Sequence, residues 1–252
     1  MEKNFDINDG GYSIRSKIYC QNQKNIDQVI LFLHGFGSYK DTAALTKFAE
    51  KVISKYKTTA VIGFDFPCHG ADARKKLMLS ECCAYLDLVK KYVHEHFGTE
   101  RIYIYATSFG GFLILKYIHE NGNPFVKIAL RSPAVNMYDS LLEHAKNSGQ
   151  YDKLMKGKEV LLGHERKVKV SPAFFEEIRE TNLNEIEFID FADELMILHG
   201  TEDDTVPFAE VEQFADNNII EFVPFEGDHR VRNPKTMDFV IHTIITFFDL
   251  GA

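Results

Sequence analysis

The chain has 252 residues, of which 45% are hydrophobic and 26% are charged, and its formal net charge is −8 at pH 7. This length and composition are typical of one globular domain with a sizeable core, and they exclude an intrinsically disordered chain. The acidic balance argues against a nucleic-acid partner, because a phosphate backbone attracts basic surfaces.

The sequence carries no targeting or membrane-spanning pattern. Residues 1–10 are polar and acidic and lack the apolar stretch of a signal peptide, and no apolar run is long enough to span a bilayer. The four cysteines have neither the number nor the spacing of a disulfide framework or a zinc site. We therefore expect a cytoplasmic protein without a membrane partner.

Short apolar runs alternate with longer amphipathic stretches, which predicts a mostly parallel sheet wrapped by helices. The alternating first strand is predicted to be antiparallel, and the continuous apolar second strand to be central and buried on both faces. Ser80 is placed as the cap of the second helix. The predicted strands are 12–19, 29–33, 60–64, 101–105, 126–130, 195–198 and 219–223, and the predicted helices are 41–55, 80–97, 109–120 and 233–250.

One stretch interrupts this alternation. Residues 136–190 are rich in charge and contain no run typical of a central strand. A structureless loop of this length is improbable in a compact domain, so the stretch should form helices of its own, with a helix beginning at Ser171–Pro172. We interpret residues 1–252 as a single domain in which residues 136–190 form an inserted cap after the predicted strand 126–130, which is the sixth strand if one further strand precedes it.

A serine follows the predicted strand 101–105 and directly precedes a helix. Ser108 is flanked by the small residues Ala106 and Gly110 at positions −2 and +2. Small residues at these positions allow a sharp strand-to-helix turn that exposes the serine hydroxyl as a nucleophile. The alternative is an ordinary serine in a strand–turn–helix unit.

A second segment, His34-Gly35-Phe36-Gly37, follows the predicted strand 29–33. The backbone N–H groups of Phe36 and Phe109 are candidates for an oxyanion hole, since they can face the same developing negative charge. For His34 itself we favour a structural role in the turn.

A base and an acid are expected after the last two strands. His229 lies in a loop after the strand 219–223, whereas most other histidines fall inside predicted helices or the cap. Asp203 follows the strand 195–198 and suits the carboxylate that orients the base, with Asp204 as a close second candidate. Ser108, Asp203 and His229 would then all lie at the carboxyl ends of strands, where α/β sheets place their sites.

These motifs together resemble the α/β-hydrolase superfamily over nearly the whole chain, and more specifically the compact bacterial carboxylesterases, including cinnamoyl and feruloyl esterases. The resemblance implies a serine hydrolase that cleaves carboxylic esters of short or aryl acyl groups through an acyl-enzyme, with no metal or organic cofactor. Cap residues should bind the small-molecule ester. The candidates are Tyr138, Leu141, Leu142, Phe174 and Phe175.

Three alternatives remain. A serine peptidase with the same triad could hold the free amine of a peptide through Glu176 and Glu177, although a solvated helix face explains that pair better. A thioesterase or acyltransferase would use the same residues, and a non-catalytic binding protein would keep only the fold. The oligomeric state and the natural substrate are left open.

Overall fold

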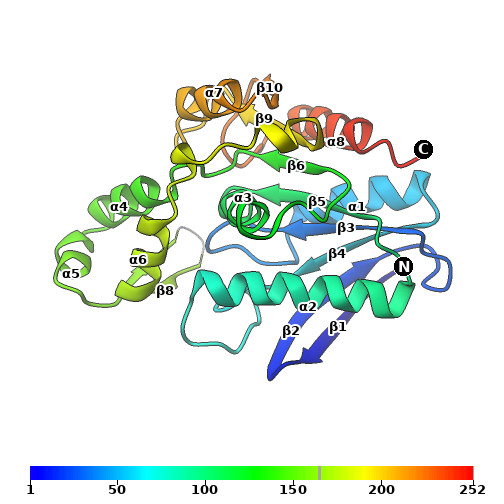
Figure 1. The fold of residues 1–252 in the computed structure, drawn as a ribbon, viewed down its shortest axis with the longest axis horizontal. Helices are drawn as coiled ribbons and strands as arrows, with labels where there is room; N and C mark the ends of the chain where they lie inside the picture. Colours follow the sequence, from blue (N-terminus) through cyan, green and yellow to red (C-terminus); the bar gives the residue numbers. More distant parts are fainter. Residues whose placement is uncertain (164–165, 252) are drawn as a thin grey trace.

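The computed structural model describes residues 1–163 and 166–251. Eight strands form one sheet in the order β1-β2-β4-β3-β5-β6-β9-β10 (Figure 1). Every neighbouring pair from β4 to β10 is parallel, whereas β1 with β2 and β2 with β4 are antiparallel. The predicted mostly parallel α/β architecture is therefore confirmed. The strands are β1 (Glu2–Asp9), β2 (Tyr12–Tyr19), β3 (Gln28–Leu33), β4 (Thr59–Phe64), β5 (Ile102–Thr107), β6 (Ile128–Arg131), β9 (Leu195–Gly200) and β10 (Glu221–Phe225).

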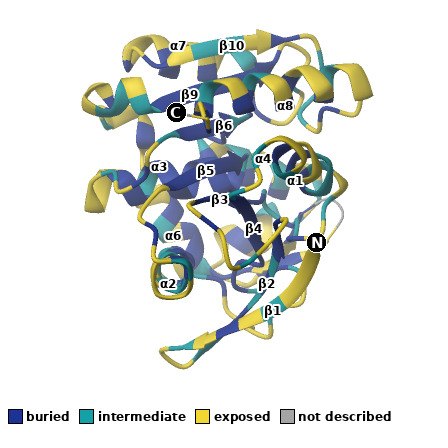
Figure 2. Ribbon diagram, turned by 90° about the vertical axis from the view of Figure 1, so that its right-hand side faces the viewer, coloured by how far each residue is buried: buried dark blue, intermediate teal, exposed yellow. Residues whose placement is uncertain are grey.

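Helices cover both faces of the sheet. Buried residues of α2, α3 and α7 pack on one face, and buried residues of α1 and α8 pack on the other. The central strands β3 and β5 are buried along their full length, while β1 is largely exposed (Figure 2). The helices of these layers are α1 (Ala43–Lys55), α2 (Leu79–Phe97), α3 (Phe109–Asn121), α7 (Phe208–Asn217) and α8 (Pro234–Phe248).

The sheet order places two loops side by side. β3 lies between β4 and β5 in the sheet. The chain passes from β3 through α1 to β4 on one side of β3, and then through α2 to β5 on its other side. Parallel sheets bind ligands at such a reversal of strand order, outside the carboxyl ends of the strands. The loop after β3 and the turn after β5 meet at this point.

The cap segment, residues 136–190, lies between β6 and β9 and is seen at the left of Figure 1. Its helix α6 begins after Ser171, whose side chain accepts a hydrogen bond from the N–H of Phe174, with Pro172 as the first helical residue. This matches the predicted helix start. Residues 164–165 of the segment lie outside the described part of the chain. The cap elements are α4 (Met137–Asn147), α5 (Tyr151–Met155), the hairpin β7 (Val160–Leu162) and β8 (Val168–Val170), α6 (Pro172–Glu180), η1 (Leu183–Glu185) and the start of η2 (Ile189–Glu194).

Three sequence-based expectations differ from the structure. β1 was not predicted, because this edge strand is mostly polar and is held by its backbone pairing with β2. β10 begins at Glu221, two residues later than expected, since Ile219 takes a left-handed φ of 57° and is 71% exposed. Ser80 does not cap α2: the helix begins at Leu79, and its first N–H donates to the carboxylate of Glu177 at 2.8 Å.

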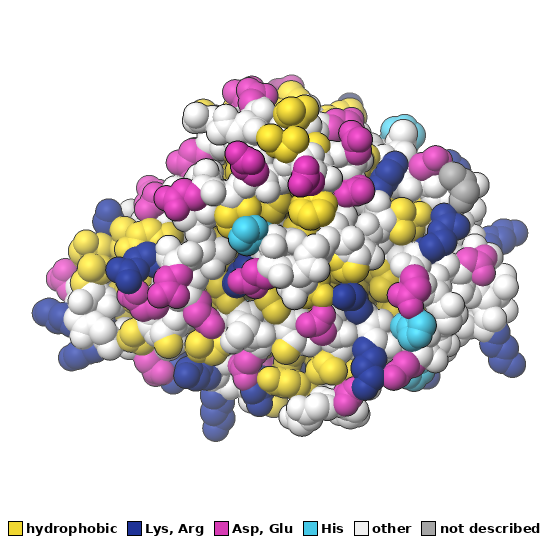
Figure 3. All heavy atoms as spheres, viewed as in Figure 1, with side chains coloured by type: hydrophobic (Ala, Val, Ile, Leu, Met, Phe, Trp, Pro, Cys, Tyr) yellow, Lys and Arg dark blue, Asp and Glu magenta, His cyan; other side chains and the backbone are white. Residues whose placement is uncertain are grey.

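The described helices include none that is both long and apolar enough to cross a membrane. On the face shown in Figure 3, Lys and Arg side chains are interspersed with Asp and Glu side chains. This face therefore has no continuous basic patch that could bind a nucleic-acid backbone.

Candidate active site

Ser108 occupies the strained turn between β5 and α3. Its backbone has φ 50° and ψ −114°, a conformation that costs energy for a residue with a side chain. The turn is held from β6, because the N–H of Ser108 donates to the carbonyl of Arg131 at 3.1 Å. The Ser108 side chain makes no capping hydrogen bond to α3, so its hydroxyl is not used to stabilise the helix.

The small residue two positions after Ser108 is required by a close approach of two chain segments. A Cβ atom at Gly110 would lie 2.4 Å from the carbonyl oxygen of Leu33, the last residue of β3. Gly35, in the loop after β3, is less tightly enclosed, since its Cβ position is 3.3 Å from the Cβ of Ser108. The backbone of the loop after β3 is thus packed directly against Ser108, with Phe36 as the next residue.

A buried histidine and a buried aspartate support the loop after β3. His34 accepts the N–H of Phe66 on Nε2 at 3.2 Å, and burial lowers the pKa of His34 to about 4. The neutral ring therefore joins the loops after β3 and β4, in agreement with a structural role for His34. Asp65 joins the same two loops by accepting the N–H groups of Lys40 and Ala71, each at 2.8 Å.

Asp203 is the carboxylate that contacts His229. The Oδ2 atom of Asp203 lies 2.7 Å from Nδ1 of His229, and the Asp203 side chain is 0% exposed. Burial alone would raise the pKa of Asp203, but the hydrogen bonds from His229 and from backbone N–H groups outweigh it and hold the pKa below its usual value of 3.8. Asp204 is exposed, and one of its carboxylate oxygens accepts the hydroxyl of Thr205.

The loops that carry Asp203 and His229 are joined through their backbones. The N–H of Thr201 donates to the carbonyl of Phe225, and the N–H of Glu202 donates to the carbonyl of Gly227. A side chain at Gly200 would collide with this contact, because its Cβ position is 2.3 Å from the Gly227 oxygen. Glycine at the end of β9 therefore lets the two loops approach closely enough for the acid and the imidazole to meet.

Ser108 and His229 line one cavity of about 540 Å³ at the carboxyl ends of the strands. In the described part of the chain their side chains form no hydrogen bond to each other, and such contacts commonly tighten only when substrate binds. Phe36, Arg131 and Asp204 also line the cavity, and the guanidinium of Arg131 donates to the backbone carbonyl of His229 at 3.3 Å. The cavity thus brings together the loops after β3, β5, β6, β9 and β10.

The sequence signature of the prolyl oligopeptidase family matches residues 51–249, which is more than half of the chain and includes Ser108, Asp203 and His229. The chain belongs to this family. Prolyl oligopeptidase family members are hydrolases of the α/β-hydrolase superfamily, so the resemblance inferred from the motifs is confirmed at that level. No curated protein sequence matches the chain significantly.

Solved structures of the same fold are distant in sequence. A putative hydrolase from Agrobacterium vitis is 19% identical with a TM-score of 0.75, and 99% of each chain is covered. Est1E from Butyrivibrio proteoclasticus is 16% identical with a TM-score of 0.75, covering 97% of this chain and 98% of Est1E. A monoglyceride lipase from Saccharomyces cerevisiae is 15% identical with a TM-score of 0.73, covering 98% and 94%. These similarities show the α/β-hydrolase fold.

The cap reaches the cavity through α4 and Gly163, and only one of the five predicted binding residues lines it. That residue is Leu141. Tyr138 instead packs against Phe175, with ring centroids 4.8 Å apart, and Leu142 packs against the core. Phe174 is fully buried behind the rings of Phe36 and Phe109. The α4 residues that line the cavity and were not predicted are Met137, Ser140, Glu143, His144 and Asn147.

The helical spacing of these residues could have identified them. They recur three or four positions apart, as residues on one face of a helix do. This face mixes polar and apolar side chains, whereas the prediction selected apolar residues. The aromatic candidates of the cap do not line the cavity because they pack on each other or on Phe36 and Phe109.

The acidic pair considered for peptide binding lies on α6, outside the cavity. Glu177 accepts the N–H of Leu79 and so caps α2, and Glu176 forms a salt bridge with Arg179 at 2.5 Å. Neither glutamate lines the cavity over Ser108. The structure therefore explains the pair without a peptide amine.

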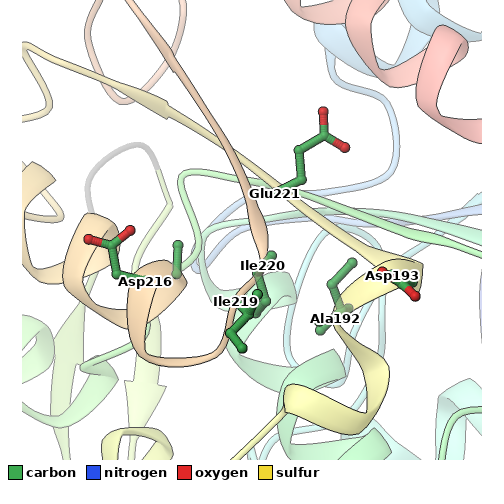
Figure 4. A pocket seen from close by; sticks show the side chains of 8 residues that line it. Ala192, Asp193, Asp216, Ile219, Ile220 and Glu221 are labelled. Atoms are coloured by element: carbon green, nitrogen blue, oxygen red, sulfur yellow. The ribbon is translucent and has the colours of Figure 1, made fainter.

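A second hollow of about 490 Å³ lies between η2, α7 and β10. Figure 4 shows the acidic side chains of Asp193, Asp216 and Glu221 pointing away from Ile219 and Ile220 at its centre. The hollow is at the amino ends of β9 and β10, the end of the sheet opposite to Ser108. It therefore has no part in the candidate active site.

Proposed function

We propose that this hydrolase cleaves carboxylic esters of short or aryl acyl groups, with Ser108 as its nucleophile. One observation carries the proposal: the hydroxyl of a strained, strand-end serine shares a cavity with an imidazole whose other nitrogen is held by a buried carboxylate. Nucleophilic catalysis by serine requires this combination of nucleophile, base and orienting acid.

In the proposed reaction, Nε2 of His229 takes the hydroxyl proton of Ser108 as its Oγ attacks the ester carbonyl carbon. Asp203 fixes the tautomer by accepting the Nδ1–H of His229 and stabilises the imidazolium that forms. The imidazolium then returns the proton to the departing alcohol oxygen. A water molecule, deprotonated by His229, attacks the acyl-enzyme and releases the carboxylic acid and free Ser108.

The tetrahedral oxyanion would be bound by the backbone N–H groups of Phe36 and Phe109. Phe109 is the first residue of α3, so its N–H has no partner within the helix, and the positive end of the helix dipole favours negative charge there. Phe36 lines the same cavity from the opposite loop. Donors that are already fixed in place stabilise charge without reorganisation.

The cavity supports a preference for small acyl groups. Its volume of about 540 Å³ lies within the range of sites for small molecules, and Met137 and Leu141 alternate on its α4 wall with polar side chains. A long acyl chain would place its methylenes against polar groups. Est1E, which has the same fold, has been solved with ferulic acid bound, an aryl acid of the class proposed here.

A peptidase is the second candidate, and the match to the prolyl oligopeptidase family is the observation that favours it. The same nucleophile, base and acid would cleave an amide. The reassignment of Glu176 and Glu177 removes the particular amine-binding pair that the sequence suggested. Peptide and ester substrates must therefore be compared directly.

The test is a substrate panel: p-nitrophenyl esters from acetate to palmitate, a methyl hydroxycinnamate, an acyl thioester and aminoacyl p-nitroanilides. We expect the highest kcat/KM for a short-chain or aryl ester. A kcat/KM that rose steadily to palmitate would contradict the acyl preference, and faster cleavage of the anilides would favour the peptidase. Wild-type protein that hydrolyses none of them and resists a fluorophosphonate probe at Ser108 would overturn the proposed function.

A further inference from the structure

A second histidine lies behind Asp203. His199 is the next-to-last residue of β9, is 0% exposed, and does not line the cavity over Ser108. Its Nε2 lies 3.3 Å from Oδ2 of Asp203 and 3.0 Å from the backbone carbonyl of Val206. It is therefore positioned to act on the acid but cannot touch a substrate in that cavity.

The two neighbours of Nε2 determine its protonation. Both the Asp203 carboxylate and the Val206 carbonyl are acceptors, so Nε2 must carry the ring proton and donate it. Burial lowers the pKa of His199 below its usual 6.5, which keeps the ring neutral at pH 7. The charged and titratable groups that influence this ring are Asp203, His229 and Arg131, and the ring of Phe208 in α7 packs against it at a centroid distance of 5.9 Å.

The Asp203 carboxylate is consequently surrounded by donors. Oδ1 accepts the backbone N–H groups of Thr205 and Val206 at 2.9 and 2.8 Å. Oδ2 accepts the Nδ1–H of His229 at 2.7 Å, and Nε2 of His199 lies 3.3 Å from the same oxygen. Three hydrogen bonds therefore hold the carboxylate, and the Nε2–H of His199, which donates to Val206, lies close enough to Oδ2 to be shared with it. Rotation of the group would break several hydrogen bonds together, so its plane is fixed relative to His229.

We propose that His199 is a positioning residue for the reaction: by donating its Nε2–H to Oδ2 of Asp203 it fixes the carboxylate and divides that oxygen between two imidazoles. This inference rests on the proposed function of Ser108, Asp203 and His229. His199 adds a neutral donor to an acid that must stay ionised while His229 carries the proton. It also fixes the loop, because it contacts both Asp203 and Val206.

The proposed role has a chemical consequence beyond packing. Without the His199 donor, Oδ2 would interact with His229 alone, and the imidazolium would be stabilised more strongly in the free enzyme. The acid limb of the pH profile of kcat/KM would then move to higher pH. The proton would be returned less readily to the leaving alcohol and the carboxylate would be freer to rotate, so kcat would fall while KM stayed near its wild-type value.

The experiment compares His199→Phe, which keeps an aromatic ring and lacks the donor, with His199→Gln, whose amide nitrogen is as many bonds from Cα as Nε2. Tyr105→Phe is the matched control, because the Tyr105 hydroxyl is also fully buried in the sheet and has no hydrogen-bond partner in the described chain. Steady-state kinetics from pH 5 to 9 would be measured with the best ester, with thermal melting of each variant as a measure of folding.

We expect His199→Phe to lower kcat about tenfold, the loss typical of one hydrogen bond to a charged group, with an unchanged KM and an acid limb at higher pH. His199→Gln should recover most of kcat and the wild-type limb, and Tyr105→Phe should match the wild type. If the Phe variant does not fold, His199→Leu provides the donor-free comparison.

Equal losses in the Phe and Gln variants, with lowered melting temperatures and an unmoved acid limb, would reduce His199 to a packing residue and overturn the inference. The proposed function is tested separately by labelling of wild-type Ser108 with the fluorophosphonate probe. If the wild type is labelled and active but the His199 variants keep the wild-type kcat and acid limb, this inference alone is refuted. If the wild type is neither labelled nor active, both this inference and the proposed function are refuted.

Discussion

The loops at the carboxyl ends of the sheet and the cap segment reach the same cavity by different means. The loops carry Ser108, Asp203 and His229 on backbones that touch one another, and side chains at Gly110 and Gly200 would collide with neighbouring carbonyl groups. The cap contributes one face of α4 together with Gly163, and its aromatic residues Tyr138, Phe174 and Phe175 pack into the core on one face of the sheet. The proposed catalytic groups are thus tied to the sheet, whereas most of the cap side chains that line the cavity lie on an inserted helix.

This difference separates three kinds of substitution. Changes at the carboxyl ends of the strands should remove catalysis for every substrate, since they alter the groups proposed to act on the carbonyl carbon common to all of them. Changes on the cavity face of α4 should alter which substrate is preferred. Changes in the core of the cap should affect stability and leave the preference intact.

The largest effect is expected for Ser108→Ala, which should lower kcat on the order of 10⁶-fold, as removal of a catalytic serine does elsewhere. Ser132→Ala is a close control, because Ser132 also follows a strand, has a left-handed φ of 48° and is buried outside the cavity. Ester turnover and circular dichroism would be measured for both. Retained turnover in a folded Ser108→Ala protein would contradict the assignment of the nucleophile.

Asp203→Asn should lower kcat about 10⁴-fold, because an amide in this place favours the wrong tautomer of His229. Asp204→Asn should lower kcat far less, since Asp204 is exposed at the cavity wall and its carboxylate accepts the hydroxyl of Thr205 rather than the N–H of His229. Single-turnover kinetics with a p-nitrophenyl ester would measure both. The opposite ranking would assign the acid to Asp204.

Leu141→Ala should shift the preferred acyl chain toward longer esters, because it opens space on the cavity face of α4. Each additional buried methylene contributes about 0.8 kcal/mol, which is about fourfold in kcat/KM. Tyr138→Leu on the same helix is the control: it disturbs the contact with Phe175 and should lower the melting temperature without changing the preference. A changed preference in Tyr138→Leu as well would mean that the cap selects substrates as one body.

The smallest effect concerns the contact between the cap and α2. Glu177→Ala should lower the free energy of unfolding by about 1 kcal/mol, the usual contribution of a helix-capping group, because it removes the acceptor for the N–H of Leu79. Glu176→Ala should change stability by less than about 0.5 kcal/mol, as is usual for surface positions. Urea unfolding measures both, and a rise in KM confined to aminoacyl anilides would restore the peptide-binding interpretation.

Much of this architecture followed from local chemistry. The continuous apolar run of β3 requires burial on both faces, and the helical spacing of Leu45, Phe48 and Val52 requires one buried face on α1; both elements are found within two residues of their predicted limits. Ser108 could be singled out because its turn needs small neighbours in sequence. β1 could not be recognised, since its stability comes from backbone pairing with β2 rather than from an apolar pattern.

The sequence by itself determined which residue types stand at the ends of the strands, because strand burial and tight turns leave a local pattern. Only the tertiary structure decided which partners they meet. It places Asp203 rather than Asp204 against His229, sets His199 behind that acid, and assigns Glu177 to the first turn of α2. These contacts join residues from separate elements or choose between neighbours in one loop, and their geometry depends on the packing of the whole sheet.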